Sequence, residues 1–356
     1  MRSARRLLLI VLLSVAAAAT SAGAAGDPTA LPCFGAASRT PGVPCVNPVL
    51  RTLVVPTPAR AQTVPDADCN VVFRSRTLFV CGWGAPQPTA VRTVALIGDS
   101  HAAHWRPALE LVAARRTWRV VSMSRAGCPL TAATTRLPTP ARSRSCRRWK
   151  RAVQRWLRAH PEVSVVLVAQ HRVRVAVPEG HSQGPEIRRG YVRAWRQVLQ
   201  PYRRHVVVLR DTPRDTPDTL RCVTAAIAGG YPAGPACAIP RSYALRPDPA
   251  VAAARALRGQ RVQTLDLTRA FCSARLCLPV VGGALVHRDT QHMTREWVTS
   301  LGPLLDAALG RLMRSWRDPV RRTGDVTDVT ASLAVDAQQG RVSPLRPASG
   351  VPATGR

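Results

Sequence analysis

The sequence has 356 residues and a formal net charge of +31, from 51 lysines and arginines against 20 aspartates and glutamates. A charge of this size predicts attraction to polyanions, and anionic polymers of the cell envelope are the expected contact. The arginines are spread along the chain and not gathered in one basic arm with interleaved aromatics, which disfavours a nucleic-acid binder. An arginine-rich surface without any dedicated partner stays open as the alternative.

The first 25 residues have the pattern of a secretory signal peptide. Arginines within residues 2–6 precede an apolar run, residues 7–19, and small residues follow with an A-x-A cleavage pattern near Ala24. This run is too short to span a bilayer, and no later stretch is apolar for the required length. We therefore expect a secreted, extracytoplasmic protein that associates with the cell envelope and has no transmembrane segment after signal cleavage.

Residues 26–91 follow the expected cleavage site and are rich in proline, alanine and threonine, with four cysteines and little periodicity. This composition predicts an extended, disulfide-pinned N-terminal extension that acts as a linker or cover. A small hairpin is expected within residues 71–81.

All ten cysteines follow the expected cleavage site, and an even number in an exported chain favours disulfides. A zinc module is disfavoured because the usual C-x-x-C doublets are absent. Sequence does not fix connectivity, but the cysteines fall into local neighbours, so we expect pairing in order along the chain. The expected pairs are Cys33–Cys45, Cys69–Cys81, Cys128–Cys146, Cys222–Cys237 and Cys272–Cys277.

From residue 92 onward, candidate strands alternate with candidate helices. The expected strands, each rich in valine, isoleucine or leucine, are residues 93–98, 119–124, 164–169, 205–210 and 261–267. The expected helices are residues 104–115, 147–160, 186–200, 250–257 and 294–313. Strands separated by helices imply right-handed βαβ crossovers and a parallel sheet covered on both faces. The expected fold class is α/β, a flavodoxin-like three-layer sandwich with a five-stranded parallel sheet over residues 92–315, followed by a disordered tail, residues 316–356.

Ser100 is the candidate nucleophile. It follows an apolar strand, residues 94–97, and a glycine that lets the chain turn sharply, so it falls where a parallel strand passes into a helix. Strand carboxyl ends line the ligand crevice of an α/β sheet, and helix N-terminal amides stabilise negative charge. The intervening Asp99 is expected to accept hydrogen bonds from backbone amides at this turn.

A serine nucleophile needs a base, and His292 is the candidate. Asp289, three residues earlier, is expected to hold the imidazole in its useful tautomer. An isolated D-x-x-H is also typical of a helix-capping aspartate beside an exposed histidine. The matching serine block favours the catalytic interpretation.

Six short blocks in the same order recur in one known superfamily. They are Gly98-Asp99-Ser100-His101-Ala102, Gly127-Cys128-Pro129, Cys146-x-x-Trp149, Asp211-Thr212-Pro213, Asp266-Leu267 with Cys272 and Cys277 after it, and Asp289-Thr290-Gln291-His292-Met293-Thr294. Through them the sequence resembles the SGNH (GDSL-like) hydrolase superfamily over about residues 92–312. Within it, the chain is most similar to the SGNH domain associated with membrane acyltransferases that O-acylate envelope polysaccharides.

The resemblance implies the SGNH hydrolase fold and a secreted serine esterase or O-acyltransferase. The implied substrates are acyl groups of cell-envelope polysaccharide, with acetyl as the expected acyl group. The implied mechanism proceeds through a Ser-His-Asp acyl-enzyme. The implied partners are the acylated glycan and a membrane acyltransferase, and nucleic acid is not expected. The motif leaves open whether water or a sugar hydroxyl resolves the acyl-enzyme.

The resemblance also implies three oxyanion donors. The first two are the amides of Ser100 and Gly127, and the third in the superfamily is an asparagine after the third strand. This sequence has Gln170 at that place, which either supplies an amide donor or faces away. Since fold does not guarantee chemistry, a catalytically impaired SGNH-fold protein that binds anionic envelope polymer stays open as the alternative function.

His101 and Trp105, close to the nucleophile, are the candidate substrate contacts. No cofactor and no metal are expected. The alternative is a zinc site built from His101, His104, His287 and His292, which would make the protein a metal hydrolase. It requires more assumptions than a Ser-Asp-His set.

Overall fold

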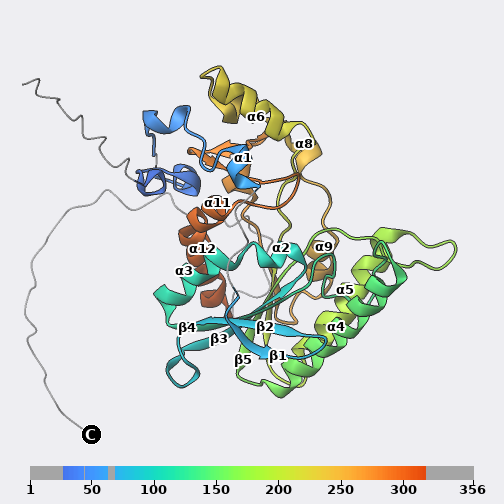
Figure 1. The fold of residues 1–356 in the computed structure, drawn as a ribbon. Helices are drawn as coiled ribbons and strands as arrows, with labels where there is room; N and C mark the ends of the chain where they lie inside the picture. Colours follow the sequence, from blue (N-terminus) through green and yellow to red (C-terminus); the bar gives the residue numbers. More distant parts are fainter. Residues whose placement is uncertain (1–26, 44, 63–68, 318–356) are drawn as a thin grey trace, which may run out of the picture.

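The computed structural model describes residues 27–43, 45–62 and 69–317 (Figure 1). The expected signal peptide, residues 1–25, and nearly all of the expected tail, residues 316–356, lie outside the described residues. No described helix is both long and apolar enough to cross a membrane.

A sheet of seven strands forms the middle layer of the molecule. Five of its strands are parallel and stand in the order β4-β3-β5-β6-β8, which confirms the expected flavodoxin-like core. These strands are β3 (Arg92–Gly98), β4 (Trp118–Ser124), β5 (Val163–Ala169), β6 (His205–Leu209) and β8 (Val262–Leu265).

The sheet is larger than expected because a hairpin extends it. The hairpin expected within residues 71–81 is present as β1 (Val71–Arg74) and β2 (Phe79–Gly84). Strand β2 pairs with β4 in antiparallel register, with Cys81 opposite Ser122. The expected count of five strands was therefore too low by this pair, since local periodicity cannot reveal a pairing partner that lies 40 residues away.

Helices cover both faces of the sheet, as the expected three-layer sandwich requires (Figure 1). Along β3, Val94 and Leu96 enter one buried cluster, whereas Ala95 and Ile97 enter the other. The first face is covered by α2 (Ser100–Ala103), α3 (Arg106–Arg116), α11 (Arg295–Ser300) and α12 (Gly302–Arg317). The second face is covered by α4 (Pro140–Ala159), α5 (Gln183–Leu199) and α9 (Pro249–Ala256).

Two helices differ from their expected bounds for local reasons. Helix α4 begins seven residues earlier than expected, where the Thr139 side chain accepts a hydrogen bond from the Arg142 amide and Pro140 occupies the first turn. The expected helix at residues 294–313 is two helices, α11 and α12. Pro303 lies in the first turn of α12, a position that its missing amide hydrogen and fixed φ favour, so it marks a new start.

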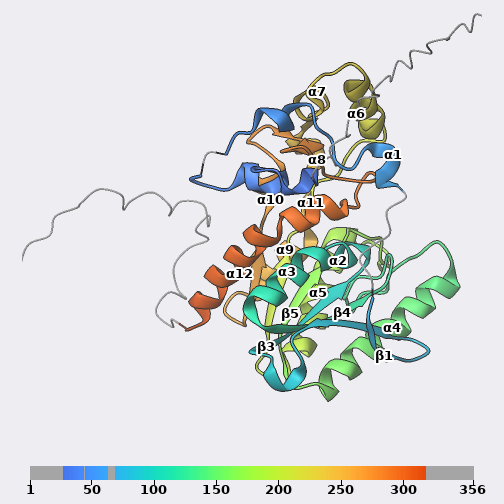
Figure 2. The same cartoon turned by 60° about the vertical axis from the view of Figure 1, so that its left-hand side comes forward.

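A second lobe stands over the sandwich, formed by residues 27–62, 219–244 and 268–285 and called the cap lobe here (Figure 2). Its own buried cluster joins Val54 and Ala61 from the N-terminal segment to Val223 and Leu285. Backbone hydrogen bonds fix the N-terminal segment in place, including Val55 N to Gly283 O at 2.8 Å.

The cap lobe contains only short elements. Its α-helices are α1 (Pro58–Ala61), α6 (Thr219–Ala228), α7 (Ala233–Ala236), α8 (Arg241–Ala244) and α10 (Thr268–Phe271). Its strands are β7 (Ile239–Pro240), β9 (Leu276–Cys277), β10 (Val280–Val281) and β11 (Ala284–Leu285), and its 3-10 turns are η1 (Pro28–Ala30), η2 (Gly35–Arg39) and η3 (Pro48–Arg51). A further turn, η4 (Gln87–Thr89), precedes β3.

Five disulfides cross-link the described residues in the expected order. Each joins cysteines that are 5 to 18 positions apart, so each stabilises one local segment. The bonds are Cys33–Cys45, Cys69–Cys81, Cys128–Cys146, Cys222–Cys237 and Cys272–Cys277.

Lys150 on α4 is a buried ammonium, and we expect it to give stability a marked pH dependence. Its Nζ donates hydrogen bonds to Ala133 O and Thr135 Oγ1, both at 2.8 Å. Burial, with the nearby charge of Arg147, lowers the pKa of Lys150 from 10.5 to about 7. Between these values the unfolded chain binds more protons than the folded one. The free energy of unfolding should therefore rise with pH in this window, by at most about 1.4 kcal/mol per pH unit from this group.

Chemical denaturation at a series of pH values checks this expectation. The Lys150→Gln variant should lose the rise between pH 7 and 10.5, whereas Arg148→Gln, an exposed charge removal on the same helix, should keep it. Parallel curves for the wild type and Lys150→Gln would show that the buried ammonium titrates as it does in the unfolded chain.

Candidate active site

Ser100 is the first residue of α2, and Asp99 alone separates it from the buried strand β3. Gly98 was expected to allow a sharp turn, but the structure gives it a different role. Gly98 still belongs to β3, and a Cβ atom on it would lie 1.8 Å from the carbonyl oxygen of Ala169 on β5. A side chain at this position would therefore push β3 and β5 apart, so glycine is required for close packing behind the nucleophile.

Asp99 holds the turn that presents Ser100. Its carboxylate is fully buried and accepts hydrogen bonds from the amides of His101 and His171, both at 2.9 Å. This confirms the expectation that Asp99 binds backbone amides. Burial raises the pKa of Asp99 to about 6, although His101 and the two amides act against this. The residue connects the β3–α2 turn to the loop after β5.

Ser100, His292 and Asp289 form a continuous hydrogen-bonded chain. His292 Nε2 lies 2.9 Å from Ser100 Oγ, and His292 Nδ1 lies 2.7 Å from Asp289 Oδ2. The partners of Ser100 come from a position 192 residues later in the chain. This is the arrangement that activates a serine: a base within hydrogen-bond reach, oriented by a carboxylate.

The loop that carries Asp289 and His292 is itself fixed. Asp289 Oδ1 accepts the amides of Gln291 and His292, both at 2.8 Å, and His287 pairs with Met293 across an antiparallel bridge. Helix α11, which follows, is capped by Thr294, whose side chain accepts from the Trp297 amide. Asp289 is therefore not the capping residue of this helix, and the capping interpretation of the D-x-x-H pattern does not hold.

Asp289 is ionised in this arrangement. Partial burial raises its pKa, but the hydrogen bonds from the His292 side chain and from the His292 and Gln291 amides outweigh burial and hold the pKa well below its usual range. The carboxylate therefore keeps a hydrogen on Nδ1 of His292 and leaves Nε2 as the acceptor toward Ser100.

The three candidate oxyanion donors come from neighbouring strands. Strand β3 lies between β4 and β5, with Gly98 opposite both Ser124 and Ala169. Gly127 follows β4 with φ of +64°, and Gln170 follows β5 directly. The strand order thus places the amides of Ser100 and Gly127 and the side chain of Gln170 at one edge of the sheet.

Gln170 has the features of an unused donor. It is 4 % exposed, and neither its Nε2 nor its Oε1 has a hydrogen-bond partner among the described residues. A buried amide without a partner is costly, and such groups are typical of functional sites that await a ligand. Within the described chain, no acceptor binds the amide hydrogen of Ser100 or Gly127 either.

Behind the nucleophile lies a second carboxylate with two histidines, a grouping that the sequence did not indicate. Asp211 Oδ1 lies 2.6 Å from His101 Nδ1, and Asp211 Oδ2 lies 3.2 Å from His171 Nδ1. Burial raises the pKa of Asp211, but the two histidines outweigh it and hold the pKa well below its usual range. The position of Asp211 in the sequence could have indicated this group. Asp211 follows β6, so it lies at the same edge of the sheet as Ser100.

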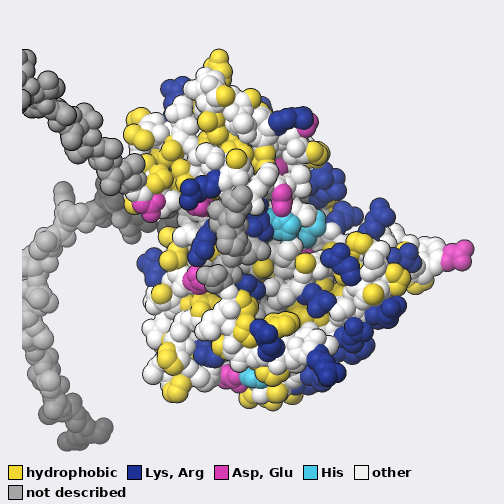
Figure 3. Space-filling view, viewed as in Figure 1, with side chains coloured by type: hydrophobic (Ala, Val, Ile, Leu, Met, Phe, Trp, Pro, Cys, Tyr) yellow, Lys and Arg dark blue, Asp and Glu magenta, His cyan; other side chains and the backbone are white. Residues whose placement is uncertain are grey.

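The two candidate substrate contacts point into the protein. His101 is 2 % exposed and is bound to Asp211, with its ring centroid 5.4 Å from that of His292. Trp105 is 3 % exposed and lines a small, partly open pocket together with Asp211 and Phe271. Neither side chain lies on the open surface. Figure 3 shows histidine atoms at the surface between the cap lobe and the sandwich.

The histidines of the zinc alternative are engaged separately. His287 lies 3.1 Å from Asp215, and His292 is bound to Ser100 and Asp289. Within residues 27–317, leaving out the undescribed gaps, one set of three ligand-type side chains is close enough to share an ion, namely His101, His171 and Asp211. Both histidines already hydrogen-bond to Asp211 through Nδ1.

Comparisons with known proteins gave a family match and a similar solved structure. A family model described as "SGNH domain (fused to AT3 domains)" matches residues 63–307, a range that includes the β1–β2 hairpin. No curated protein gives a sequence match. One similar solved structure is the periplasmic domain of a lipopolysaccharide acetyltransferase from Salmonella ser. Paratyphi A, with a TM-score of 0.48 and 13% identity, covering 64% of this chain and 85% of that one.

Proposed function

The chain belongs to the family of SGNH domains that occur fused to AT3 domains, and from this premise we propose that it is a serine esterase or O-acyltransferase. Its proposed substrates are acyl groups on cell-envelope polysaccharide, and the proposed acyl group is acetyl. The observation that carries the proposal is the hydrogen-bonded chain from Ser100 through His292 to Asp289. It gives the serine a base at hydrogen-bond distance and gives the base a carboxylate.

In the proposed mechanism, Ser100 Oγ attacks the acyl carbonyl while His292 Nε2 accepts the hydroxyl proton. Asp289 stabilises the imidazolium that forms. The developing oxyanion is held by the amides of Ser100 and Gly127 and by Nε2 of Gln170, whose buried, unpartnered side chain supports this role. His292 then returns the proton to the departing alcohol, and water or a sugar hydroxyl resolves the acyl-enzyme by the same steps in reverse.

The proposed compartment is outside the cytoplasm, at the cell envelope. Five disulfides support this, because such bonds persist in oxidising compartments. The family description supports a membrane acyltransferase as the functional partner that delivers the acyl group.

A serine-directed fluorophosphonate probe tests the proposal on the purified full chain. We expect one labelled peptide, with the phosphonate on Ser100, because His292 activates this hydroxyl alone among the described serines. Labelling should be lost in Ser100→Ala and should fall strongly in His292→Ala. Folded protein that resists the probe, or label on a different serine, would contradict the proposed mechanism.

A further inference from the structure

Helix α4 carries a row of arginines on one side. The row, called the arginine stripe here, consists of Arg144, Arg147, Arg148, Arg151, Arg155 and Arg158, all exposed. At 3.6 residues per turn these positions fall within a sector of about 100°, and they extend over about 21 Å of the helix axis. Trp149, Val153 and Trp156 are buried on the opposite side of the helix. Folding thus aligns arginines that look scattered in the sequence.

The charge of the stripe is not neutralised within the described structure. Helix α4 has no acidic residue, and none of the six side chains has a hydrogen bond or ion pair with another described residue. The neighbouring helix α5 differs, because its Glu186 pairs with Arg189 and Arg193. Like charges at i,i+3 and i,i+4 positions destabilise a helix, so the stripe is kept at a cost to stability. Figure 3 shows basic side chains gathered where Figure 1 places α4 and α5.

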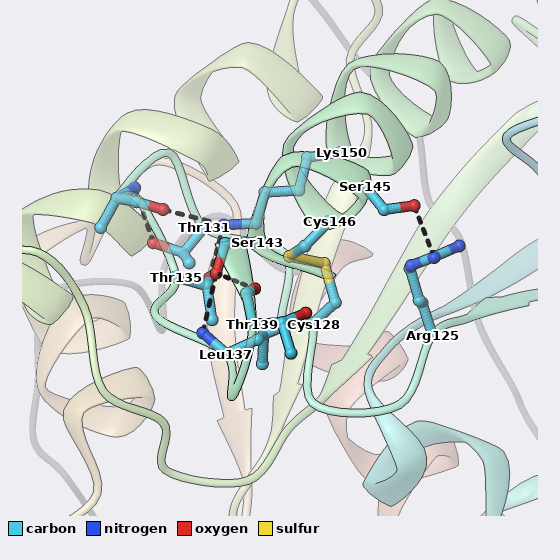
Figure 4. Close-up of a disulfide and its surroundings, with 11 residues drawn as sticks. Arg125, Cys128, Thr131, Thr135, Leu137, Thr139, Ser143, Ser145, Cys146 and Lys150 are labelled. Atoms are coloured by element: carbon cyan, nitrogen blue, oxygen red, sulfur yellow. Dashed lines mark hydrogen bonds between the residues drawn. A yellow bond between two sulfur atoms is a disulfide. The ribbon is translucent and has the colours of Figure 1, made fainter. Parts of the chain in front are cut away.

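The stripe begins beside the candidate active site. Cys146, between Arg144 and Arg147, forms a disulfide with Cys128, which is the residue after the candidate oxyanion donor Gly127 (Figure 4). Arg125 in the same loop donates from Nη2 to Ser145 Oγ at 2.7 Å. A covalent bond and a hydrogen bond therefore hold the first turns of α4 against the loop that follows β4, at the edge of the sheet where Ser100 lies.

We propose that the arginine stripe binds an anionic envelope polysaccharide and guides it to Ser100. The inference rests on the proposed function and adds the substrate class, a glycan with a repeated negative charge. Guanidinium forks bind carboxylate and phosphate groups through paired hydrogen bonds, and a straight row of them matches an extended polymer. A neutral glycan would gain nothing from this row.

Binding of the purified full chain to polygalacturonate, a glycan with one carboxylate per sugar, tests the proposal. The variant Arg147→Gln/Arg151→Gln/Arg155→Gln should bind about tenfold more weakly than the wild type, because each exposed ion pair contributes modestly and three are removed. The control Arg51→Gln/Arg255→Gln/Arg311→Gln removes the same charge from three exposed arginines on other elements and should bind nearly as the wild type does. Added salt should weaken wild-type binding, and neutral dextran should not bind.

A second variant keeps the test independent of how the first one folds. Arg144→Gln/Arg148→Gln/Arg158→Gln removes the other half of the stripe and should weaken binding to a similar extent. Equal losses in a stripe variant and the control would reduce the effect to net charge and overturn the proposal. Tighter binding of single-stranded DNA than of polygalacturonate at the same salt concentration would assign the stripe to nucleic acid and overturn it as well.

The Ser100→Ala variant separates this inference from the proposed function. It should bind polygalacturonate as tightly as the wild type, because Ser100 lies outside the stripe. Wild-type protein that binds through the stripe but turns over no ester would reject the proposed catalysis alone. Ester turnover by a protein whose stripe variants bind normally would reject the stripe alone.

Discussion

Replacement of Ser100 by alanine should lower kcat for an aryl acetate by about a millionfold, the largest effect expected of any single substitution here. The variant has no oxygen to form the acyl-enzyme, so His292 and Asp289 retain their positions without a nucleophile to activate. The residual rate would come from the oxyanion donors and from binding alone. The KM should change little, since in the described structure Oγ makes its one hydrogen bond to His292. Steady-state kinetics on the purified chain measures both constants.

The matched control is Ser315→Ala on α12, where an exposed hydroxyl donates only to the carbonyl of Leu312. It should keep the wild-type kcat. Thermal unfolding of Ser100→Ala should occur near the wild-type temperature, which would show that the loss is chemical. A Ser100→Ala variant with the wild-type kcat would reject an acyl-enzyme on Ser100, and the nucleophile would then have to be another group near His292.

The parallel sheet could be predicted because its strands are buried on both faces. A strand such as β3, with Val94 through Ile97 in contact with two separate clusters, has to be apolar throughout and is visible in the sequence. The hairpin β1–β2 was visible too, but its attachment to β4 was not, because pairing depends on which sheet edge is free after folding. The cap lobe has no such signal, since its short helices and two-residue strands depend on contacts between segments far apart in the chain.

The hydrogen-bonded set of Ser100, His292 and Asp289 could be predicted for a chemical reason, because these residues lie in two short blocks whose proposed roles follow from residue type. The contacts of the side chains around Ser100 were not predicted. His101 and Trp105 were expected to face the substrate because they follow Ser100 closely. In a helix each residue turns the side chain by about 100°, so residues adjacent in the sequence point in different directions. That turn directs His101 to Asp211, an interaction between residues 110 positions apart.

The arginine stripe was also missed in the sequence. Along the whole sequence the arginines appear evenly distributed, but the expected helix at residues 147–160 already contains Arg147, Arg151 and Arg155 at a spacing that places them on one side. The start of this helix at Thr139 was visible as a threonine followed by proline, a known N-terminal signal. A helix started there also includes Arg144, but the 3.6-residue period within residues 147–160 was already enough to indicate the rest of the stripe.

Replacement of Asp289 by asparagine should lower kcat by about 10⁴-fold while the loop keeps its structure. The asparagine oxygen can still accept the amides of Gln291 and His292, as Asp289 Oδ1 does now. Its NH2 group then faces Nδ1 of His292, where the carboxylate Oδ2 stood. Two donors cannot share one hydrogen bond, so Nδ1 becomes the acceptor and the imidazole hydrogen moves to Nε2. That atom faces Ser100 Oγ at 2.9 Å and can no longer accept its proton.

Kinetics of three variants separate this effect from a structural one. Asp218→Asn, which alters an exposed carboxylate bound to Arg221 on α6, should keep the wild-type kcat. Asp289→Ala should lose kcat and also unfold at a lower temperature, because the two amide hydrogen bonds disappear with the carboxylate. An Asp289→Asn protein with wild-type kcat would restrict Asp289 to holding the loop, and His292 would then act without a carboxylate partner. The size of the Asp289→Asn loss therefore measures how far the chemistry depends on the tautomer of His292.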